Sequence, residues 1–305
     1  MDENFKVYAI VVTFNGERWI EKSVSSLLQS SVPLIPIIID NHSTDSTVSI
    51  LKAKFPGVLI LENEKNRGFG QANNLGIKYA MAHDADFVFL LNQDAWIFEN
   101  TIKNMLEVYT PEYGILGPVQ LCAEGNDLEL NFKKNLAPAF LLQTVTDYWL
   151  GVEKKINDAS FISAAGWLIP AMTIQRIGGF DPLFFHYGED NNYCHRVSYH
   201  GLKIGLVINA HICHDSEENG FLNYPGHKEI ELKVILSNIN IPWKHGWIYL
   251  EYKKEMLLRE RSLKVLENKR KKMEEFMIAY ESLKKNQTLI LKSREINQSE
   301  GLLWL

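Results

Sequence analysis

The sequence has few cysteines, no long hydrophobic run and no excess of positive charge. Its three cysteines, Cys122, Cys194 and Cys213, lie far apart without a C-x-x-C pair, which predicts reduced thiols, not a disulfide framework or zinc site. No apolar run reaches the ~18 residues of a membrane span, and the opening MDENFK lacks the features of a secretion signal. A formal net charge of −5 argues against nucleic-acid binding. We expect a cytoplasmic protein, and peripheral contact at the inner membrane face stays open.

The chain does have enough apolar residues for a large core, and its charge is unevenly distributed. Of its 305 residues, 46% are apolar and 23% are charged, which is typical of a globular protein. Residues 1–250 contain 19 basic and 28 acidic side chains, whereas residues 251–285 contain 11 basic and 7 acidic ones. The change of sign predicts an α/β domain over residues 1–220 and a helical C-terminal extension over residues 221–305.

Short apolar segments alternate with helical patterns over the first 120 residues. Each apolar run is long enough for a buried strand and too short for a buried helix. The alternation predicts a mostly parallel sheet flanked by helices, in which ligands bind beyond the carboxyl ends of the strands. The expected strands cover residues 7–12, 37–39, 58–61 and 87–91, and the expected helices cover residues 17–30, 70–82 and 189–200.

Residues 247–285 have the pattern of one long helix. Apolar side chains, among them Tyr252, Met256, Met273 and Tyr280, recur at helical spacings and predict a seam that packs on the α/β domain or on a second copy of the chain. The basic excess and the nearby aromatic residues leave contact with anionic lipid open as an alternative.

Polar residues follow each of the four expected strands, in segments 13–16, 40–45, 66–74 and 92–94. Amide and carboxylate groups at one sheet edge can form hydrogen bonds with a base and a ribose, and a carboxylate there can hold a divalent cation against phosphates. Asn, Asp and Gly also simply form turns after strands. Four such segments at one predicted edge favour a binding site.

A second group of candidate residues lies further along the chain. Glu189 and Asp190 follow the glycine pair 178–179 and open an expected helix, whose dipole favours ionised carboxylates. An ionised carboxylate at a pocket edge can act as a general base, although the same residues also stabilise a helix N-terminus. His214 can supply a neutral imidazole to a metal ion bound by Asp94.

In their order and spacing, these segments resemble the inverting, GT-A-fold glycosyltransferases of family 2 over roughly residues 6–216. The N-R-G-F-G-Q-A-N-N stretch and the N-Q-D ending are most similar to the rhamnosyltransferase-like branch. The resemblance implies transfer of a sugar from dTDP-rhamnose or a UDP-sugar to a hydroxyl of a glycan or lipid-linked acceptor, in bacterial surface polysaccharide synthesis. The matching segments are Val11–Asn15, Ile39–Asp45, Asn66–Gly70, Leu91–Asp94, Gly178–Asp181 and Glu189–Asp190.

The resemblance also implies a role for each matching residue. Asp190 would be the catalytic base, with Glu189 beside it. Asp94 and His214 would bind Mg²⁺ or Mn²⁺ at the two phosphates, and Asp40 would accept the N3–H of uracil or thymine. The nucleotide, ribose, pyrophosphate and transferred sugar or acceptor would lie against Thr13, Asn15, Asn66, Gly68, Asn73, Asn92, Gly166 and Trp167.

One position departs from the family pattern. Asn92 stands where many members have the first Asp of a D-x-D motif, so cation binding would depend on Asp94, His214 and the phosphates. The departure leaves open a catalytically degenerate protein that binds nucleotide sugars or scaffolds a synthesis complex. A sugar-phosphate nucleotidyltransferase is a weaker alternative, because the segment 13–18 contains one glycine where such an enzyme has a Gly-rich, Arg-bearing loop.

Overall fold

A nine-stranded mixed sheet forms the centre of the protein. The computed structural model describes residues 5–135, 142, 145–147, 149–216, 220–261 and 267–305. The strands are β1 (Val7–Thr13), β2 (Leu34–Asp40), β3 (Leu59–Glu62), β4 (Phe87–Asn92), β5 (Ala95–Ile97), β6 (Tyr113–Leu121), β7 (Ile156–Ala159), β8 (Gly166–Pro170) and β9 (Lys203–His214). They are ordered β3-β2-β1-β4-β8-β6-β9-β5, and β7 pairs with β9.

The first four strands are parallel, as the alternation of strand and helix patterns predicts. β1 pairs with β2 and β4, and β2 pairs with β3, all in parallel register. All seven residues of β1 are buried, because helices cover both faces of this part of the sheet. β8 is antiparallel to β4 and β6, while β5 and β7 are antiparallel to β9. Thr13, Asp40 and Asn92 end three neighbouring parallel strands and therefore lie at one edge.

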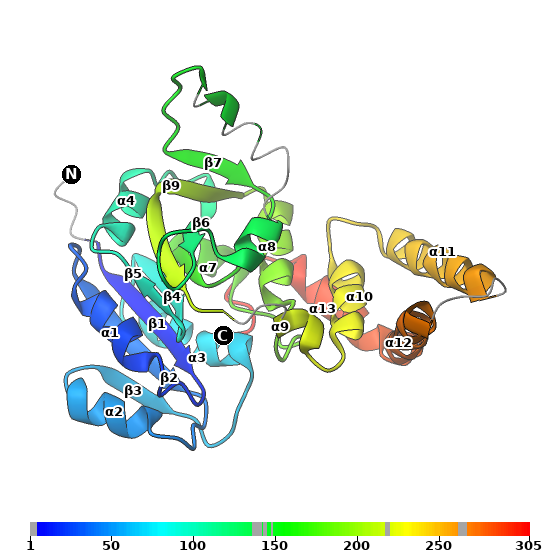
Figure 1. Ribbon diagram of the computed structural model, residues 1–305, viewed down its shortest axis with the longest axis horizontal. Coiled ribbons are helices and arrows are strands. Elements are labelled where there is room, and N and C mark those ends of the chain that lie inside the picture. The colour runs from blue at the N-terminus through cyan, green and yellow to red at the C-terminus, as the bar shows by residue number, and fades with distance from the viewer. Residues whose placement is uncertain (1–4, 136–141, 143–144, 148, 217–219, 262–266) are drawn as a thin grey trace.

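Seven helices of the described chain flank the sheet (Figure 1). Alternate side chains of β1 enter opposite cores: Ile10 packs with residues of α3 and α8, and Val11 packs with residues of α1 and α4. The flanking helices are α1 (Ile20–Leu28), α2 (Thr47–Lys54), α3 (Phe69–Ala82), α4 (Thr101–Glu107), α5 (Leu130–Asn135), α7 (Ala171–Ile177) and α8 (Glu189–Tyr199).

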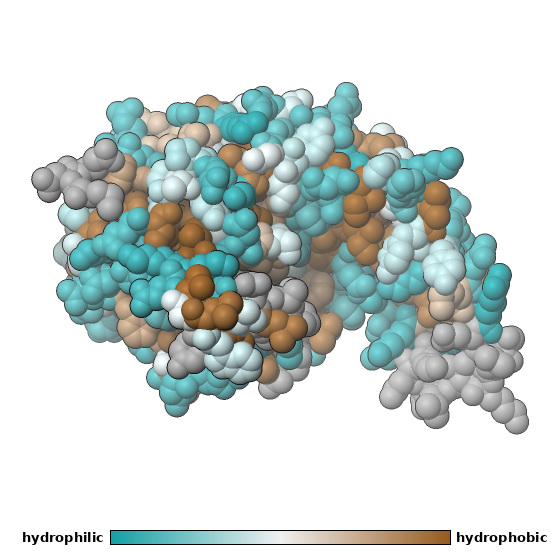
Figure 2. All heavy atoms as spheres, turned by 90° about the horizontal axis from the view of Figure 1, so that it is seen from above, coloured by the Kyte–Doolittle hydropathy of each residue, from teal (hydrophilic) through white to brown (hydrophobic). Residues whose placement is uncertain are grey.

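The C-terminal part is helical, as expected, and consists of α9 (Gly220–Asn223), α10 (His227–Ser237), α11 (Trp243–Arg261), α12 (Glu267–Lys285) and α13 (Gln287–Asn297). A third hydrophobic core joins these helices, with Leu232, Leu250, Phe276 and Ile290 among its buried residues. Figures 1 and 2 show α11 and α12 in a lobe that stands away from the sheet, whereas the chain end returns to the neighbourhood of α3. The boundary near residue 220 stays a prediction.

The expectation of one long helix over residues 247–285 is wrong. α11 and α12 are separate helices that pack against each other and against α10. Met273 and Tyr280 are buried within this lobe, whereas Tyr252 and Met256 are 62% and 43% exposed. Of these four seam residues, only the two on α12 are therefore buried inside the extension. Self-association and lipid contact through this region stay predictions.

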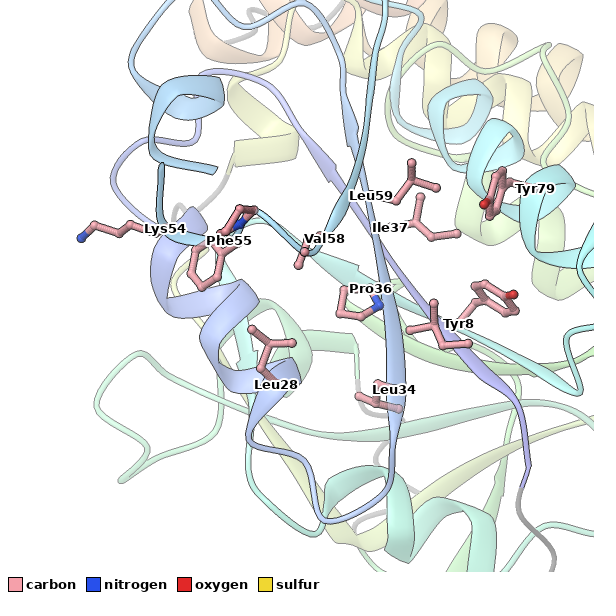
Figure 3. Close-up of a pocket in the computed structure, with 13 residues that line it drawn as sticks. Tyr8, Leu28, Leu34, Pro36, Ile37, Lys54, Phe55, Val58, Leu59 and Tyr79 are labelled. Carbon is pink, nitrogen blue, oxygen red and sulfur yellow. The ribbon is translucent and has the colours of Figure 1, made fainter. Parts of the chain in front are cut away.

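No helix in the described ranges is both long and apolar enough to cross a membrane. A cavity of about 570 Å³ opens at the amino ends of β1, β2 and β3, where Tyr8, Pro36, Leu59 and Tyr79 line it (Figure 3). No carboxylate is among its lining residues. Because ligands of parallel sheets bind at the carboxyl ends of the strands, this cavity is distinct from the candidate site.

Candidate active site

Asn92, Asp94 and His214 meet where the chain passes from the end of β4 into β5, which pairs with the end of β9. His214 Nε2 lies 3.4 Å from Asp94 Oδ1 and 3.4 Å from Asn92 Nδ2. The backbone fixes this geometry, because β5 pairs Ala95 with His214 and the Asp215 amide donates to the Asp94 carbonyl at 2.9 Å. Asp94 and His214, which are far apart in the sequence, are thus brought together. These are the two residues that the sequence analysis expected to bind a metal ion.

The electrostatic surroundings of His214 are acidic. Its burial lowers the imidazole pKa, but the charge and hydrogen bond of Asp94, together with Glu129 and Asp215, outweigh burial and raise the pKa above its ordinary value. Glu129 is 4% exposed. A cation-binding imidazole must be neutral, so the acidic surroundings that raise the pKa of His214 favour a proton over a cation at the imidazole.

The residues present fit a cation that is shared with a substrate. The Asn92 Oδ1 atom is buried and has no hydrogen-bond partner within the described chain. Across the same residues, no cluster of three or more His, Cys, Asp or Glu side chains is placed to hold a metal ion. Since Mg²⁺ is commonly held by one or two carboxylates plus substrate phosphates, Asn92, Asp94 and His214 suit an open site that a diphosphate completes.

The ends of β1 and β2 form the next part of the edge. Thr13 Oγ1 donates to Gln93 Oε1 at 2.8 Å, and the Phe14 amide donates to the same oxygen at 2.9 Å. Asn15 Oδ1 accepts from the Thr44 amide at 2.8 Å. These bonds fix the loop after β1 against the loops after β2 and β4.

Asp40 offers an acceptor that no described group uses. Its side chain is 3% exposed, and Oδ2 accepts from the Ser43 amide at 3.1 Å. The Oδ1 atom is buried and lacks a partner among the described residues. An unpaired buried carboxylate oxygen is costly, and a ligand N–H can remove that cost.

The loop before α3 is held by a network of asparagines. Asn41 Nδ2 donates to Asn66 Oδ1 at 2.9 Å, and Asn66 Oδ1 also accepts from the Gly68 amide at 2.8 Å. Gly68 has φ +79°, and a Cβ there would lie 2.0 Å from the Phe185 carbonyl oxygen. Only glycine allows this conformation and approach together. The expected pyrophosphate loop therefore contacts the segment that leads to Glu189.

Glu189 and Asp190 open α8 next to this loop. A Cβ on Gly70 would lie 3.6 Å from the Glu189 Cβ. The Asp190 carboxylate accepts from the Ala164 amide, and the adjoining Ala165 carbonyl accepts from the Asn92 amide at 3.1 Å. Asp190 and Asn92 are thus attached to consecutive residues of one short segment, which brings the carboxylate pair to the end of β4.

Burial raises the pKa values of Glu189 and Asp190 to different extents. The pKa of Glu189 is raised to about 8 by burial and by the charge of Asp190. Burial also raises the pKa of Asp190, but backbone amides of Asn191, Asp190 and Ala164 offset part of that effect and leave it at about 6. Because both pKa values are raised, this pair retains a proton near neutral pH more readily than two exposed carboxylates would, and the backbone amides favour Asp190 as the ionised member.

We expect Glu189→Gln to reduce the loss of stability with rising pH. A carboxyl group with a raised folded-state pKa stabilises the fold fully below its unfolded value of 4.5, and this contribution disappears as pH rises to about 8. Gln imitates the protonated group and has no charge to acquire. Thermal unfolding between pH 4.5 and 8 should show the melting temperature of the wild type falling by roughly 5 °C relative to the variant. Parallel curves, like those expected for the exposed control Glu99→Gln, would contradict the raised pKa.

Three expected ligand-contacting residues lie beneath the site. Trp167 is fully buried, and its Nε1 donates to the Ile162 carbonyl at 3.2 Å. Asn73 is 1% exposed and donates to the Phe69 carbonyl within α3. A Cβ on Gly166 would lie 2.9 Å from Ile212 Cδ1. These three residues pack in the protein interior under the site. Direct contact between the Trp167 ring and a sugar is not supported.

Several residues of this edge were not expected from the sequence. Gln93 binds the loop after β1, and Asn41 binds the loop before α3, although both stood inside the quoted motifs as spacers. Asp215 Oδ2 accepts from Arg18 at 2.8 Å and from Trp19 at 2.7 Å. Glu129 has no sequence signal at all, because only the fold brings it near His214.

Comparison with known proteins identifies similar chains. Residues 8–162 match the sequence profile described as "Glycosyl transferase family 2". The N-acetylglucosaminyl-diphospho-decaprenol L-rhamnosyltransferase of Mycobacterium tuberculosis is 25% identical over 228 residues, covering 67% of this chain and 74% of the relative. The dTDP-rhamnosyl transferase RfbF of Shigella flexneri is 22% identical over 223 residues, covering 69% of each chain.

Solved structures show the same fold. The mannosyltransferase PcManGT of Pyrobaculum calidifontis, solved with GDP-Man and Mn²⁺, has a TM-score of 0.59 at 15% identity, covering 91% of this chain and 86% of that one. TarS residues 1–349 of S. aureus, solved with UDP, has a TM-score of 0.52 at 18% identity, covering 96% and 88%. The expected GT-A fold and the rhamnosyltransferase-like resemblance are confirmed. This chain belongs to glycosyl transferase family 2.

Proposed function

We propose that this protein transfers a sugar from a nucleoside diphosphate donor to a sugar hydroxyl, with inversion at the anomeric carbon. The supporting observation is that the Asp190 carboxylate of α8 lies next to the Ala164 amide, while the adjoining Ala165 carbonyl accepts from the amide of Asn92, which lies beside His214 and Asp94. A base and a diphosphate-binding group then stand at one sheet edge. This is the arrangement that a single displacement requires.

Asp190 acts on the acceptor. It takes the proton of the attacking hydroxyl while the new bond to the anomeric carbon forms and the bond from that carbon to the β-phosphate oxygen breaks. Such general base catalysis typically contributes ~10²–10⁴-fold. Glu189 stays protonated beside it, so that a second negative charge does not oppose ionisation of Asp190. Because no covalent enzyme intermediate forms, the configuration at the anomeric carbon inverts.

Asp94, His214 and Asn92 would lie at the leaving group of the donor. They would hold a divalent cation, Mg²⁺ or Mn²⁺, which when bound neutralises the charge of the departing diphosphate as a Lewis acid. Two structural neighbours, PcManGT and the glycosyltransferase GalNAc-T7, were solved with Mn²⁺, which supports this choice. Asn92 adds no negative charge to the site formed with Asp94 and His214. The donor phosphates therefore supply the rest of the negative charge that the cation needs.

Asp40 selects the base of the donor. An ionised carboxylate accepts hydrogen bonds and donates none. The unpaired Oδ1 of Asp40 therefore needs a donor, and the N3–H of uracil or thymine is one. UDP-sugars and dTDP-rhamnose are therefore the proposed donors. The names of the relatives above, which specify rhamnosyl transfer and a lipid-linked N-acetylglucosamine, support a rhamnosyl donor and a glycan or lipid-linked acceptor in surface polysaccharide synthesis.

Nucleotide binding tests this proposal. UDP or dTDP with Mn²⁺ should raise the melting temperature, and GDP should not, since a ligand at 100 times its Kd stabilises by about 2.7 kcal/mol. Asp40→Asn should weaken UDP or dTDP binding roughly tenfold, because an amide replaces a charged acceptor. The isosteric change Asp84→Asn, at an exposed turn after α3, is the control. Equal stabilisation by GDP would contradict the role of Asp40.

The products distinguish this proposal from its alternatives. A transferase releases a nucleoside diphosphate from the donor, whereas a nucleotidyltransferase releases pyrophosphate. A scaffold protein would bind the donor and release neither. The buried carboxylate pair Glu189 and Asp190, whose pKa values are both raised by burial, favours the transferase, because perturbed pKa values are typical of catalytic groups.

A further inference from the structure

The segment 178–188, which leads to Asp190, contains no regular helix or strand. Side chains from α8 and α3 bind its backbone instead. Arg196 of α8 donates to the carbonyls of Ile177 and Gly179. Asn74 of α3 binds both polar groups of Phe180, accepting from its amide at 2.7 Å and donating to its carbonyl at 2.8 Å. The path of this segment is therefore set by a few buried hydrogen bonds.

The C-terminus supplies the remaining bonds. The Gly179 amide donates to the Leu303 carbonyl at 2.8 Å, and Asn74 Nδ2 donates to the Trp304 carbonyl at 3.1 Å. Gly178 has φ +76°, and a Cβ there would lie 2.1 Å from the Leu303 carbonyl oxygen. The chain end thus packs directly on the glycine pair, which agrees with its return to α3 in Figure 1.

Asp181 is the centre of this contact. Its side chain is 1% exposed, and Oδ2 accepts from Ser293 Oγ and, at 2.7 Å, from Asn297 Nδ2. Asn297 is fully buried, and its Oδ1 accepts from Trp304 Nε1 at 2.9 Å. We call Asp181, Ser293, Asn297 and Trp304 the C-terminal clasp. A buried carboxylate needs such partners, so loss of one weakens the attachment of the segment to the C-terminal helix.

The far end of the same segment touches both halves of the active site. The Phe185 carbonyl accepts from the Phe69 amide at 3.1 Å, next to Gly68 of the pyrophosphate loop. Gly188, with φ +87°, is the N-cap of α8 and directly precedes Glu189 and Asp190. A shift at Asp181 is therefore transmitted along the nine residues that lead to Asp190, whereas the pyrophosphate loop has separate support from Asn41 and Asn66.

We propose that Asp181 and Asn297 are positioning residues that set the location of Asp190 through the segment 178–188. The inference rests on the proposed function, since it assumes that Asp190 is the base. Neither residue touches the reacting atoms. The C-terminal extension is then part of the catalytic machinery through this contact. A purely structural contact would change stability and leave the chemical step unaltered.

Exchanging the side chains of Asp181 and Asn297 tests whether they position Asp190. Asn297→Asp places two carboxylates together, and Asp181→Asn leaves two amides. Each single variant should lower kcat for donor turnover roughly 10- to 100-fold and change the donor KM less than about twofold, as expected when an interaction specific to the transition state is lost. The double variant restores an amide–carboxylate pair with the charge on α13 and should recover most of kcat.

Controls separate this role from folding and from the proposed function. Leu302→Ala changes an exposed residue of the same tail and should behave as wild type. Trp304→Phe removes the indole N–H that donates to Asn297 Oδ1 while keeping an aromatic ring, and should still lower kcat several-fold, which covers the case that the Asp181 variants do not fold. Amide hydrogen exchange of residues 178–190 should accelerate in every clasp variant, irrespective of turnover.

Each outcome of these experiments points to one conclusion. A wild-type protein without any donor turnover refutes the proposed function, while the exchange data still report whether the clasp fixes the segment. An active wild type whose folded clasp variants keep kcat, or whose double variant recovers nothing, refutes the positioning role. Loss of stability with unchanged kcat refutes that role as well.

Discussion

Asp190→Asn is expected to lower kcat by roughly 10²–10⁴-fold while the donor still binds. Asn has the shape of Asp but cannot accept the hydroxyl proton, so the acceptor must attack the anomeric carbon as a neutral hydroxyl. The donor contacts at Asp40, Asp94 and His214 stay in place, so the affinity for UDP or dTDP with Mn²⁺ should not change. Release of nucleoside diphosphate measures kcat, and thermal shift measures binding.

The pH profile gives an independent check on Asp190. The wild-type rate should rise with pH through the pKa of about 6 at which Asp190 becomes ionised, and the residual rate of Asp190→Asn should lack this limb. Asp84→Asn, the same chemical change on the exposed turn, is expected to keep both rate and profile. Near-wild-type turnover by Asp190→Asn would refute the base assignment.

The parallel half of the fold could be predicted because its strands are uninterrupted apolar runs. β1 and β4 are buried on both faces, and their bounds agree with the expected strands to within one residue. The second half could not be predicted in this way. β6 contains Gly114, Gly117 and Pro118, and β9 contains Gly205 and Asn209, so neither has a continuous apolar pattern. Their strand conformation depends on neighbours distant in sequence, with a register shift at Pro118.

The residues of the candidate site likewise fall into those that could be predicted from the sequence and those that could not. Residues that follow a predictable strand, such as Asp40 and Asp94, could be placed at the edge from topology alone. The contact of His214 with Asp94 follows from the pairing of β5 with β9, which the sequence did not reveal. The family resemblance implied that Trp167 lies beside the donor sugar or acceptor, yet its side chain on the antiparallel strand β8 is buried in the core. The C-terminal clasp could not be predicted from the sequence, since more than 100 residues separate Asp181 from its partners Ser293 and Asn297.

Asp94→Ala is expected to weaken Mn²⁺-dependent binding of UDP or dTDP by two orders of magnitude or more, about 2.7 kcal/mol. Asp94 is the only carboxylate paired with His214 at this edge among the described residues, so its loss leaves one imidazole and one amide for the cation. Binding measured with a chelator in place of Mn²⁺ should be weak and equal in both proteins. Asn92→Asp, which adds a carboxylate beside Asp94, should change cation affinity in the opposite direction.

The protonation of His214 makes this prediction testable in the wild type. Asp94 raises the pKa of His214, and only the neutral imidazole binds a cation. Mn²⁺-dependent affinity should therefore fall as pH is lowered through a value above the ordinary 6.5 of histidine, and metal-free binding should not follow that curve. In Asp94→Ala, burial is no longer opposed by that charge, so the midpoint of His214 followed by NMR should move to lower pH. A wild-type affinity for nucleotide that is unaffected by the chelator, at any pH, would show that this cluster does not bind a catalytic cation.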